Sequence, residues 1–493
     1  MPQTRCEWMY IHAKLPLAMT PAQLCIGTRQ PCRLGLGLGL SLASTLTCAN
    51  AEHSQHTTFV DATTLEATST TLETTSIAST SASPDVDSET TAPEDSTTSS
   101  STTTGDPTSG PPRLDLGLLP DAGTPEPCPA PGPDLLYTHI WIANSAEGTV
   151  SKLDTRTRDE LGRYRTSGGI NDNPSRTAVN QEGDVAVVNR LGGVVKIIAD
   201  PSRCLDANND GVVTTSTHGN NVHTWGKDEC VAWWTPLPPR SRPVAWTPGT
   251  IVGEGCQAHY EGINLWVSAP IDNDIRVYQL ANDDGSIVNE VQIPGLGDMG
   301  PFGIYGGAVD SEGDFWGVVY NQGPLVHVNR DDLSYTLIDL PQPSAYGITV
   351  DHEGRPWVGG FDGTLQRYNP AENSWTSVET GTTSLLRGMT EDAHANLWVA
   401  ALNPSGVLRV ETNQNEVLGW YTELPGLEKP TGTSVDYDGM VWVVDQTAGE
   451  SGGAFVLAPE DGTVVDFIGG LHGPYTYSDM TDWALGNVVH PNG

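Results

Sequence analysis

The stretch YGITVDHEGRPWV at residues 346–358 decides how this chain folds. It predicts a short apolar strand, a turn of the Asp-x-x-Gly type and a second strand that opens on Trp357. Two more strand-like runs follow, GTLQRYN at 363–369 and SWTSVE at 374–379, with an Asn-Pro turn between them. Four such strands form one antiparallel sheet. Because a single sheet cannot bury both of its faces, we expect copies of it to stack.

The pairing of Asp351 with Trp357, six positions later, is repeated along the chain. The other copies with this spacing are Asp310 with Trp316, Asp392 with Trp398 and Asp436 with Trp442. Weaker copies begin at Asn180 and Tyr260, and Trp141 marks a seventh. The tryptophans at 316, 357, 398 and 442 recur every 41 to 44 residues, a period typical of one β-propeller blade.

The blade of Trp141 has no inner strand in front of it. YSDMTD at residues 477–482 aligns with YGITVD at 346–351 and is predicted to supply that strand. Pairing the two ends also removes exposed strand edges. We therefore predict an all-β fold after a disordered N-terminal region: a seven-bladed β-propeller of four-stranded antiparallel blades over residues 135–493. Its N- and C-terminal segments pair to close the ring.

Residues 1–51 have the pattern of an export signal. Arg29 and Arg33 precede the apolar run at 34–46, and Ala-Asn-Ala at 49–51 offers a small-x-small cleavage site. A run of this length is too short to span a bilayer, which needs about 20 residues. The sequence therefore predicts a secreted or cell-surface protein without a transmembrane span.

A lipid anchor at Cys48 is the alternative to simple secretion, but Thr45 and Thr47 stand where lipidation motifs carry other residues. Residues 52–134 are rich in Ser, Thr, Pro and acidic residues and have almost no aromatics. Such a segment cannot bury enough apolar surface to offset chain entropy, so it is predicted to be a disordered linker.

The chain carries a net charge of −37, from 61 acidic and 24 basic residues. A protein this acidic repels polyanions, which makes nucleic acid, heparin and bare anionic membranes poor partners. Cleavage after the signal leaves four cysteines in an oxidising compartment. Cys204 and Cys230 bracket the one large insertion, at residues 203–231, and are predicted to form a disulfide. Cys128 with Cys256 then follows by elimination.

The insertion contains a motif for a hard cation. DANNDGVVT at residues 206–214 matches the start of an EF-hand or dockerin-type calcium loop, which offers oxygen ligands at alternate positions and a turn glycine. The predicted ligands are Asp206, Asn208, Asp210, Val212 and Thr214. Thr217 stands where the bidentate acid is usual, and Asp228 or Glu229 is a possible substitute. We predict a structural Ca²⁺ site, against the alternative of an Asx-rich turn without metal.

Aromatic and histidine residues in the repeat are interpreted by their position. A tryptophan at one register of every blade favours packing between blades. This interpretation covers Trp141, Trp266, Trp316, Trp357 and Trp398. His352 and His394 lie in the turn beside the repeated aspartate and are predicted to be solvent-facing turn residues, not metal ligands.

The phrase x-Gly-Ile-Thr-Val-Asp-x-x-Gly-x-x-Trp-Val resembles the seven-bladed propellers of the streptogramin (virginiamycin B) lyase and NHL-repeat class, from about residue 135 to the end. The signal, spacer, calcium-type insertion and Tyr-Ser-Asp-Met-Thr close are similar to exported myxobacterial propeller proteins. The resemblance implies the fold. In the lyases it also implies a catalytic His and Glu at the channel mouth, with magnesium.

The positions that match those catalytic residues hold other side chains here. Three places after each repeat tryptophan or its stand-in there is no Glu; the residues are Asn144, Asn189, Ala269, Val319, Gly360, Ala401 and Asp445. Before the inner-strand glycine there is no His; the residues are Ser175, Tyr305, Tyr346, Arg387, Thr431 and Tyr477. The lyase acid/base pair is absent from its expected places, and fold alone does not confer that activity.

These positions are instead predicted to form a recognition surface at the mouth of the central channel. The candidate ligand-binding residues are Arg176, Tyr305, Tyr346, Arg387, Tyr477, Asn144, Asn189 and Asp445. Tyrosines, arginines and amides suit a polar ligand or peptide. The favoured function is a binding or scaffold module for a glycan, a peptide or an exported protein, and we expect a monomer. The alternative is a lyase or hydrolase, streptogramin-lyase-like or lactonase-like, with a rearranged channel site.

Overall fold

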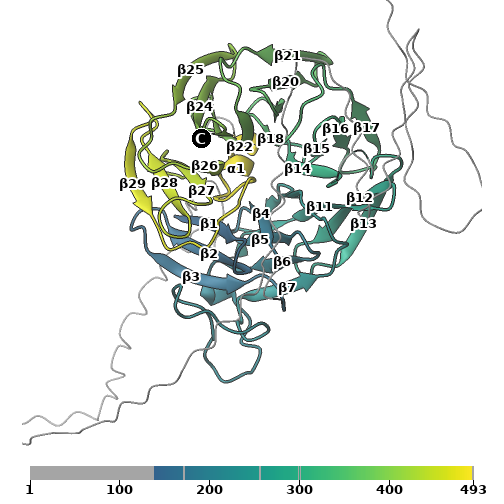
Figure 1. Cartoon of the computed structure of the whole chain (residues 1–493). Coiled ribbons are helices and arrows are strands. Elements are labelled where there is room, and N and C mark those ends of the chain that lie inside the picture. The colour runs from purple at the N-terminus through teal and green to yellow at the C-terminus, as the bar shows by residue number, and fades with distance from the viewer. Residues whose placement is uncertain (1–137, 170–171, 255–256, 298, 300, 491–493) are drawn as a thin grey trace, which may run out of the picture. The chain divides into compact units, whose positions relative to one another are not determined.

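A computed structural model describes residues 138–490, except for 170–171, 255–256, 298 and 300. Seven sheets stand in a ring around a central channel, which confirms the predicted seven-bladed propeller (Figure 1). The predicted signal region, with Cys48, and the predicted linker lie outside the described residues. So do Cys128 and Cys256, the second predicted disulfide pair.

Each blade is an antiparallel sheet numbered outward from the channel. The first three blades, in chain order, are β1 (His139–Asn144), β2 (Thr149–Asp154) and β3 (Glu160–Arg165); β4 (Pro174–Val179), β5 (Val185–Asn189), β6 (Val194–Ile197) and β7 (Val231–Thr235); and β8 (Val244–Trp246), β11 (Asn264–Ile271), β12 (Asp274–Ala281) and β13 (Ile287–Ile293). The next two are β14 (Ile304–Val309), β15 (Phe315–Val319), β16 (Leu325–Val328) and β17 (Tyr335–Ile338); and β18 (Gly347–Val350), β19 (Pro356–Gly359), β20 (Leu365–Asn369) and β21 (Ser374–Val378). The last two are β22 (Leu385–Glu391), β23 (Asn396–Leu402), β24 (Gly406–Glu411) and β25 (Glu416–Tyr421); and β26 (Pro430–Val435), β27 (Val441–Asp445), β28 (Gly453–Leu457) and β29 (Val464–Ile468).

The repeated aspartate and tryptophan are joined by a hydrogen bond inside each regular blade. The indole Nε1 of Trp357 donates to Oδ2 of Asp351 at 2.8 Å. The same bond links the pairs 310/316, 392/398 and 436/442 at 2.7, 2.9 and 2.8 Å. Trp141, Trp266, Trp357, Trp398 and Trp442 are fully buried, and Trp316 is nearly so. The six-residue spacing therefore places a buried indole on a buried carboxylate, and the predicted packing role of the tryptophans is confirmed.

The third blade departs from the predicted pattern. Tyr260 lies in β10 (His259–Glu261), which pairs with β9 (Thr250–Val252) in a separate hairpin. The inner strand of that blade is β8, and it pairs with β11. The interpretation of Tyr260 as the start of a weak repeat is therefore wrong, because a hairpin is inserted between the first two strands.

The first blade is closed by the C-terminal segment, as predicted. The amide of Trp141 donates to the carbonyl of Met480 at 2.9 Å, and the amide of Tyr475 donates to the carbonyl of Ala143 at 3.0 Å. Between them, the amide of Ala143 donates to the hydroxyl of Thr476 at 3.0 Å. A side chain thus replaces one backbone acceptor. For this reason the segment follows the edge of β1 without forming a regular ladder.

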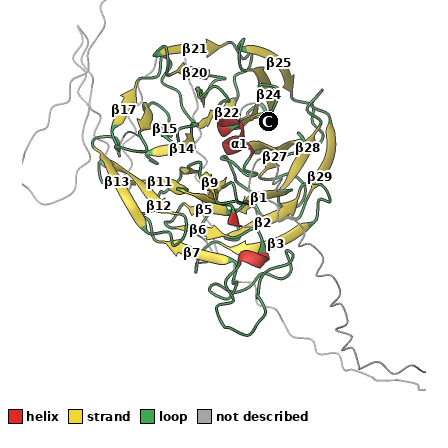
Figure 2. Cartoon of the chain, turned by 180° about the vertical axis from the view of Figure 1, so that it is seen from behind, coloured by secondary structure: helices red, strands yellow, loops and turns green. Residues whose placement is uncertain are grey.

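A short helix that the sequence analysis did not predict follows the closing segment. Helix α1 (Trp483–Val489) lies near the centre of the ring in both views (Figures 1 and 2). Its buried Leu485 and Val488 pack on the core formed by inner strands, and the indole of Trp483 donates to the carbonyl of Glu391 at 2.9 Å. None of the described helices is long and apolar enough to cross a membrane.

The large insertion connects β6 to β7 and projects from the ring beside β3 and β7 (Figure 1). It begins after a short 3-10 helix, η1 (Pro201–Arg203). Cys204 and Cys230 form the predicted disulfide, with an S–S distance of 2.05 Å. This bond fixes both ends of the loop to the buried edge of the second blade.

Candidate functional site

Four tyrosines meet at the end of the channel where the inner strands begin. Tyr305 is the second residue of β14, Tyr346 directly precedes β18, and Tyr475 and Tyr477 belong to the closing segment. The hydroxyl of Tyr346 lies 2.9, 3.1 and 3.0 Å from those of Tyr305, Tyr475 and Tyr477. Tyr305 and Tyr475 are joined at 3.1 Å. Inner strands from different blades thus bring these phenols into one hydrogen-bonded group.

Four arginines stack on these rings. The guanidinium carbons of Arg176 and Arg387 lie 4.1 and 5.0 Å from the centre of the Tyr477 ring. That of Arg190 lies 4.0 Å from the Tyr475 ring, and that of Arg242 lies 4.0 Å from the Phe302 ring. Tyr320 and Phe361 contact the same rings at their edges. We call the whole group the mouth cluster; its members are Arg176, Arg190, Arg242, Arg387, Phe302, Tyr305, Tyr320, Tyr346, Phe361, Tyr475 and Tyr477.

The mouth cluster has a buried part and a partly exposed part. Its buried members are Tyr305, Tyr346, Tyr477, Arg176, Arg387 and Arg242. The half-buried members are Arg190, Phe302, Tyr320, Phe361 and Tyr475. The five residues that the sequence analysis predicted here are therefore brought together, but they form the layer beneath the surface. The exposed layer consists of residues that it missed.

The guanidinium groups of the mouth cluster lack acidic partners among the described residues. Arg176 donates to the carbonyls of Ser175 and Tyr305 at 3.0 and 3.1 Å. Arg387 donates to the carbonyl of Pro430 and the hydroxyl of Tyr477. Neither forms an ion pair there, and the same holds for Arg190 and Arg242. The Nε atoms of all four, and Nη2 of Arg190, are buried without a hydrogen-bond partner in this part of the chain.

This charge arrangement changes the acidity of neighbouring groups. Burial lowers the pKa of Arg242, and the nearby cations Arg190 and Arg176 lower it further. Burial opposes ionisation of Tyr475, but the positive charges of Arg387, Arg190 and Arg176 outweigh it and lower its pKa well below the usual value. Burial instead raises the pKa of Tyr305. Tyr475 is thus the phenol in the group that ionises most readily.

The other three predicted site residues do not join the mouth cluster. Asn144, Asn189 and Asp445 are fully buried, and each fixes a loop of its own blade. Asp445 accepts the amides of Glu428 and Lys429 at 2.7 Å each. Asn144 donates to the hydroxyls of Thr149 and Ser151 and accepts the amide of His472, and Asn189 bonds both ways with Thr166. Their polar atoms are already bonded within the chain.

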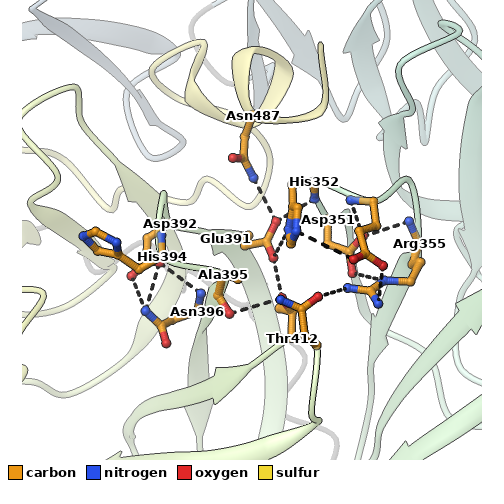
Figure 3. A network of polar contacts seen from close by, with 12 residues as sticks. Asp351, His352, Arg355, Glu391, Asp392, His394, Ala395, Asn396, Thr412 and Asn487 are labelled. Atoms are coloured by element: carbon orange, nitrogen blue, oxygen red, sulfur yellow. Dashed lines mark hydrogen bonds and ion pairs between the residues drawn. The ribbon is translucent and has the colours of Figure 1, made fainter. Parts of the chain in front are cut away.

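A second polar network lies at the opposite end of the channel, where the inner strands end and α1 sits (Figure 3). Glu391 accepts the imidazole Nδ1 of His352 at 3.0 Å, the hydroxyl of Thr412 at 2.6 Å and the amide of Asn487 at 2.8 Å. Burial, and then the charge of Asp351, raises the pKa of Glu391. His352 lies in the turn, but the prediction that it faces solvent is wrong, because it is half-buried and the carboxylate of the next blade binds it. His394 is exposed, as predicted.

The predicted calcium loop is organised by its own carboxylates. Asp206 accepts the amides of Asp210 and Gly211 at 3.2 and 2.8 Å, and Asn208 accepts the amide of Asp210 at 2.8 Å. Glu229 reaches across to the amides of Ala207 and Thr214 at 3.0 and 2.6 Å. Asp228 instead accepts the hydroxyl of Thr215 and the amide of Ser216, just after the loop. Of the two candidate substitutes for the missing acid, Glu229 is the one beside the loop.

A separate group in the fourth blade could hold a metal ion. Among the described residues, Asp310, Asp314 and His327 are the set of three whose possible ligand atoms lie within 4.8 Å of one another. His327 contacts Asp314 at 2.9 Å and stacks on Trp316 at 4.2 Å. Burial raises the pKa of Asp310. Burial also acts on Asp314, but hydrogen bonds from His327 and from the amide of Arg330 lower its pKa overall. This group was not predicted from the sequence, because Asp310 and Asp314 lie in one turn between β14 and β15 whereas His327 comes from β16.

Comparisons with known proteins find remotely similar solved structures. No protein-family model and no curated protein matches this sequence. A streptogramin B lyase structure is 14% identical over 62% of this chain and 86% of its own, with a TM-score of 0.44. Virginiamycin B lyase from Staphylococcus aureus is 17% identical over 62% and 87%, with a TM-score of 0.42. Apo AztD from Citrobacter koseri is 12% identical over 69% and 97%, with a TM-score of 0.43. Similarity this remote carries no argument about activity.

Proposed function

We propose that this chain is an exported binding or scaffold propeller whose recognition surface is the mouth cluster. The observation that carries the proposal is a set of half-buried aromatic rings beside arginines with unpartnered N–H groups. Aromatic and arginine side chains dominate the binding energy of recognition surfaces because they combine apolar area with directed hydrogen bonds. The expected partners are a glycan, a peptide or an exported protein. The signal-like N-terminal sequence supports action outside the cell.

Truncating exposed members of the mouth cluster is expected to weaken binding without unfolding the protein. A screen of glycans, peptides and exported proteins first identifies a ligand. Arg190→Ala and Tyr320→Ala should then each lower its affinity by roughly thirtyfold, about 2 kcal/mol. Arg156→Ala is the matched control, because Arg156 is exposed and pairs with Asp438 in the turn after the end of β26, away from the mouth. Ligand binding that survives both mouth variants would place recognition elsewhere.

A lyase or hydrolase is the second candidate function. Tyr475 favours it, because a phenol whose pKa is lowered by neighbouring cations can act as a general base. The expected result for an enzyme is turnover of a lactone or cyclic depsipeptide that Tyr475→Phe abolishes, while ligand binding persists. Binding without turnover by the wild type favours the recognition function.

We also propose that the insertion takes Ca²⁺ through Asp206, Asn208 and Asp210, with Glu229 as the additional acid. Calcium at about 100 times its dissociation constant should stabilise the domain by about 2.7 kcal/mol, because it binds the folded state alone. Differential scanning calorimetry with and without chelator measures this gain. Asp206→Ala and Asp210→Ala should abolish it.

His327→Gln is the control for the calcium experiment, because it alters the Asp310, Asp314 and His327 group and leaves the loop intact. The calcium effect should persist in this variant. If His327→Gln removes the effect and Asp206→Ala does not, the ion binds in the fourth blade and the loop assignment is wrong.

A further inference from the structure

The mouth cluster gathers positive charge in a strongly acidic protein. The chain has only 24 lysines and arginines against 61 acidic residues, yet four arginines stack within this one group of rings. Some other arginines in the described ranges do meet carboxylates, for example Arg156 with Asp438, Arg163 with Glu160 and Arg355 with Asp351. Others form no ion pair there either; they are Arg165, Arg240, Arg330, Arg367 and Arg409. What distinguishes the mouth is that four arginines without an acidic partner stack within one group of rings.

Four close guanidinium groups repel one another, and burial removes the water that would screen them. Burial lowers the pKa of Arg242, and the neighbouring cations Arg190 and Arg176 lower it further, which is the expected sign of this repulsion. Tyr475 supplies one negative charge if it ionises, and three positive charges remain unbalanced. An anion bound between the arginines would remove the repulsion and satisfy N–H groups that have no partner within the described residues.

We propose that the mouth cluster binds a small carboxylate joined to a ring, and this inference rests on the recognition function proposed above. Arginine presents its N–H groups as a planar fork that matches a carboxylate. Arg190 is half-buried as a residue, but its Nε and Nη2 are buried, so a carboxylate would have to enter between the rings to reach them. Phe302, Tyr320, Phe361 and Tyr475 offer ring faces and edges beside it for the uncharged part of the ligand.

The surroundings favour this ligand class over other anions. The net charge of −37 would repel a polyanion strongly, whereas the repulsion of a monoanion is small. Inorganic sulfate or phosphate would leave the aromatic side of the cluster uncovered. An aromatic acid and a sugar acid share the required chemistry, because each joins one carboxylate to a ring.

The test is isothermal titration with two matched pairs of probes: benzoate against benzamide, and glucuronate against glucose. At least one acid should bind, and its neutral partner should bind about tenfold more weakly or worse, as expected for hydrogen bonds to a charged group. Arg190→Gln and Arg242→Gln should each lower the affinity for the acid by about ten- to a hundredfold. Arg156→Gln should leave it unchanged. A difference between benzoate and benzamide would identify an aromatic acid as the ligand, and a difference between glucuronate and glucose would identify a sugar acid.

A thermal measurement checks that the variants fold. Without any anion, Arg242→Gln should melt at or above the wild-type temperature, because it removes a repelled charge that has no acidic partner. With saturating acid the order should reverse, because only the wild type gains full stability from the ligand.

Several results would overturn the inference. Equal binding of an acid and its neutral partner, or an effect of sulfate equal to that of the acid, excludes a carboxylate-specific site. If Arg190→Gln and Arg242→Gln both leave acid binding intact, the acid binds at another site. A neutral ligand lost on Tyr320→Ala, with no acid bound at all, would keep the proposed recognition function and reject this ligand class.

Discussion

Replacing Met480 with alanine is expected to lower the free energy of unfolding by about 2–5 kcal/mol, the usual cost of emptying a well-packed core site. The Met480 side chain is fully buried among Ile140, Ile142 and Trp442, and its carbonyl accepts the amide of Trp141. The closing segment therefore joins the last part of the chain to the first blade through packing as well as hydrogen bonds. Urea unfolding followed by tryptophan fluorescence measures the loss.

Met299→Ala is the matched control, because Met299 is 43% exposed and should change stability by less than about 0.5 kcal/mol. Deleting residues 475–493 extends the test by exposing the edge of β1, and it should lower the melting temperature further than the point variant. If Met480→Ala and Met299→Ala unfold at the same urea concentration, the closing segment does not contribute to the fold as described.

Asp351→Ala is expected to cost about 3–5 kcal/mol, the range found when one partner of a buried ion pair is removed. Asp351 is fully buried and accepts Nε of Arg355 at 2.7 Å, the indole of Trp357 at 2.8 Å and two turn amides at 2.9 and 3.0 Å. Without it, the buried guanidinium keeps only the exposed Glu353 as a carboxylate partner, and a buried indole loses its acceptor. Denaturant titration of the purified domain gives the difference.

Asp332→Ala serves as the comparison for this prediction. Asp332 also accepts a turn amide, that of Ser334 at 2.8 Å, but it is exposed. Its removal should cost less than about 1 kcal/mol, because water replaces the lost bond. Similar losses for the two aspartates would mean that the repeated aspartate does not act through its buried contacts.

The propeller was predictable because one local interaction is repeated. The indole reaches the carboxylate only at a fixed spacing across a tight turn, so the pattern records blade geometry directly. The hairpin of β9 and β10 escaped prediction because an aromatic residue and a following tryptophan imitate the repeat. Helix α1 escaped because its seven residues follow an irregular strand and make only about two turns, too few to show a helical period.

The buried half of the mouth cluster was also predictable, because Tyr305, Tyr346 and Arg387 share one register at the start of inner strands. The exposed half was missed because the comparison used the third position after the repeat tryptophan. Adjacent residues of a strand point to opposite faces. The fourth position holds Arg190, Tyr320 and Phe361 in three blades, and each lies in the mouth cluster. Asn144, Asn189 and Asp445, at the third position, bond within their own blades.

The lack of acidic partners at the mouth could not be derived from sequence. It depends on the ring geometry, which brings together four arginines from different segments and brings no carboxylate next to them. These arginines are Arg176, Arg190, Arg242 and Arg387. Residues this far apart in the sequence cannot be known to lie close together in space until the arrangement of the blades is known. The same reason explains why the contact between His352 and Glu391 was missed, since it joins two neighbouring blades.

The most direct test of the central claim is a crystal structure of the propeller soaked with 4-bromobenzoate, with data collected at the bromine absorption edge. We expect an anomalous peak among Phe302, Tyr320 and Tyr475, with the carboxylate facing Arg190 and Arg242. The soak uses a concentration that saturates the wild type in solution. A peak elsewhere on the protein, with none at the mouth cluster, would show that the carboxylate site is not there.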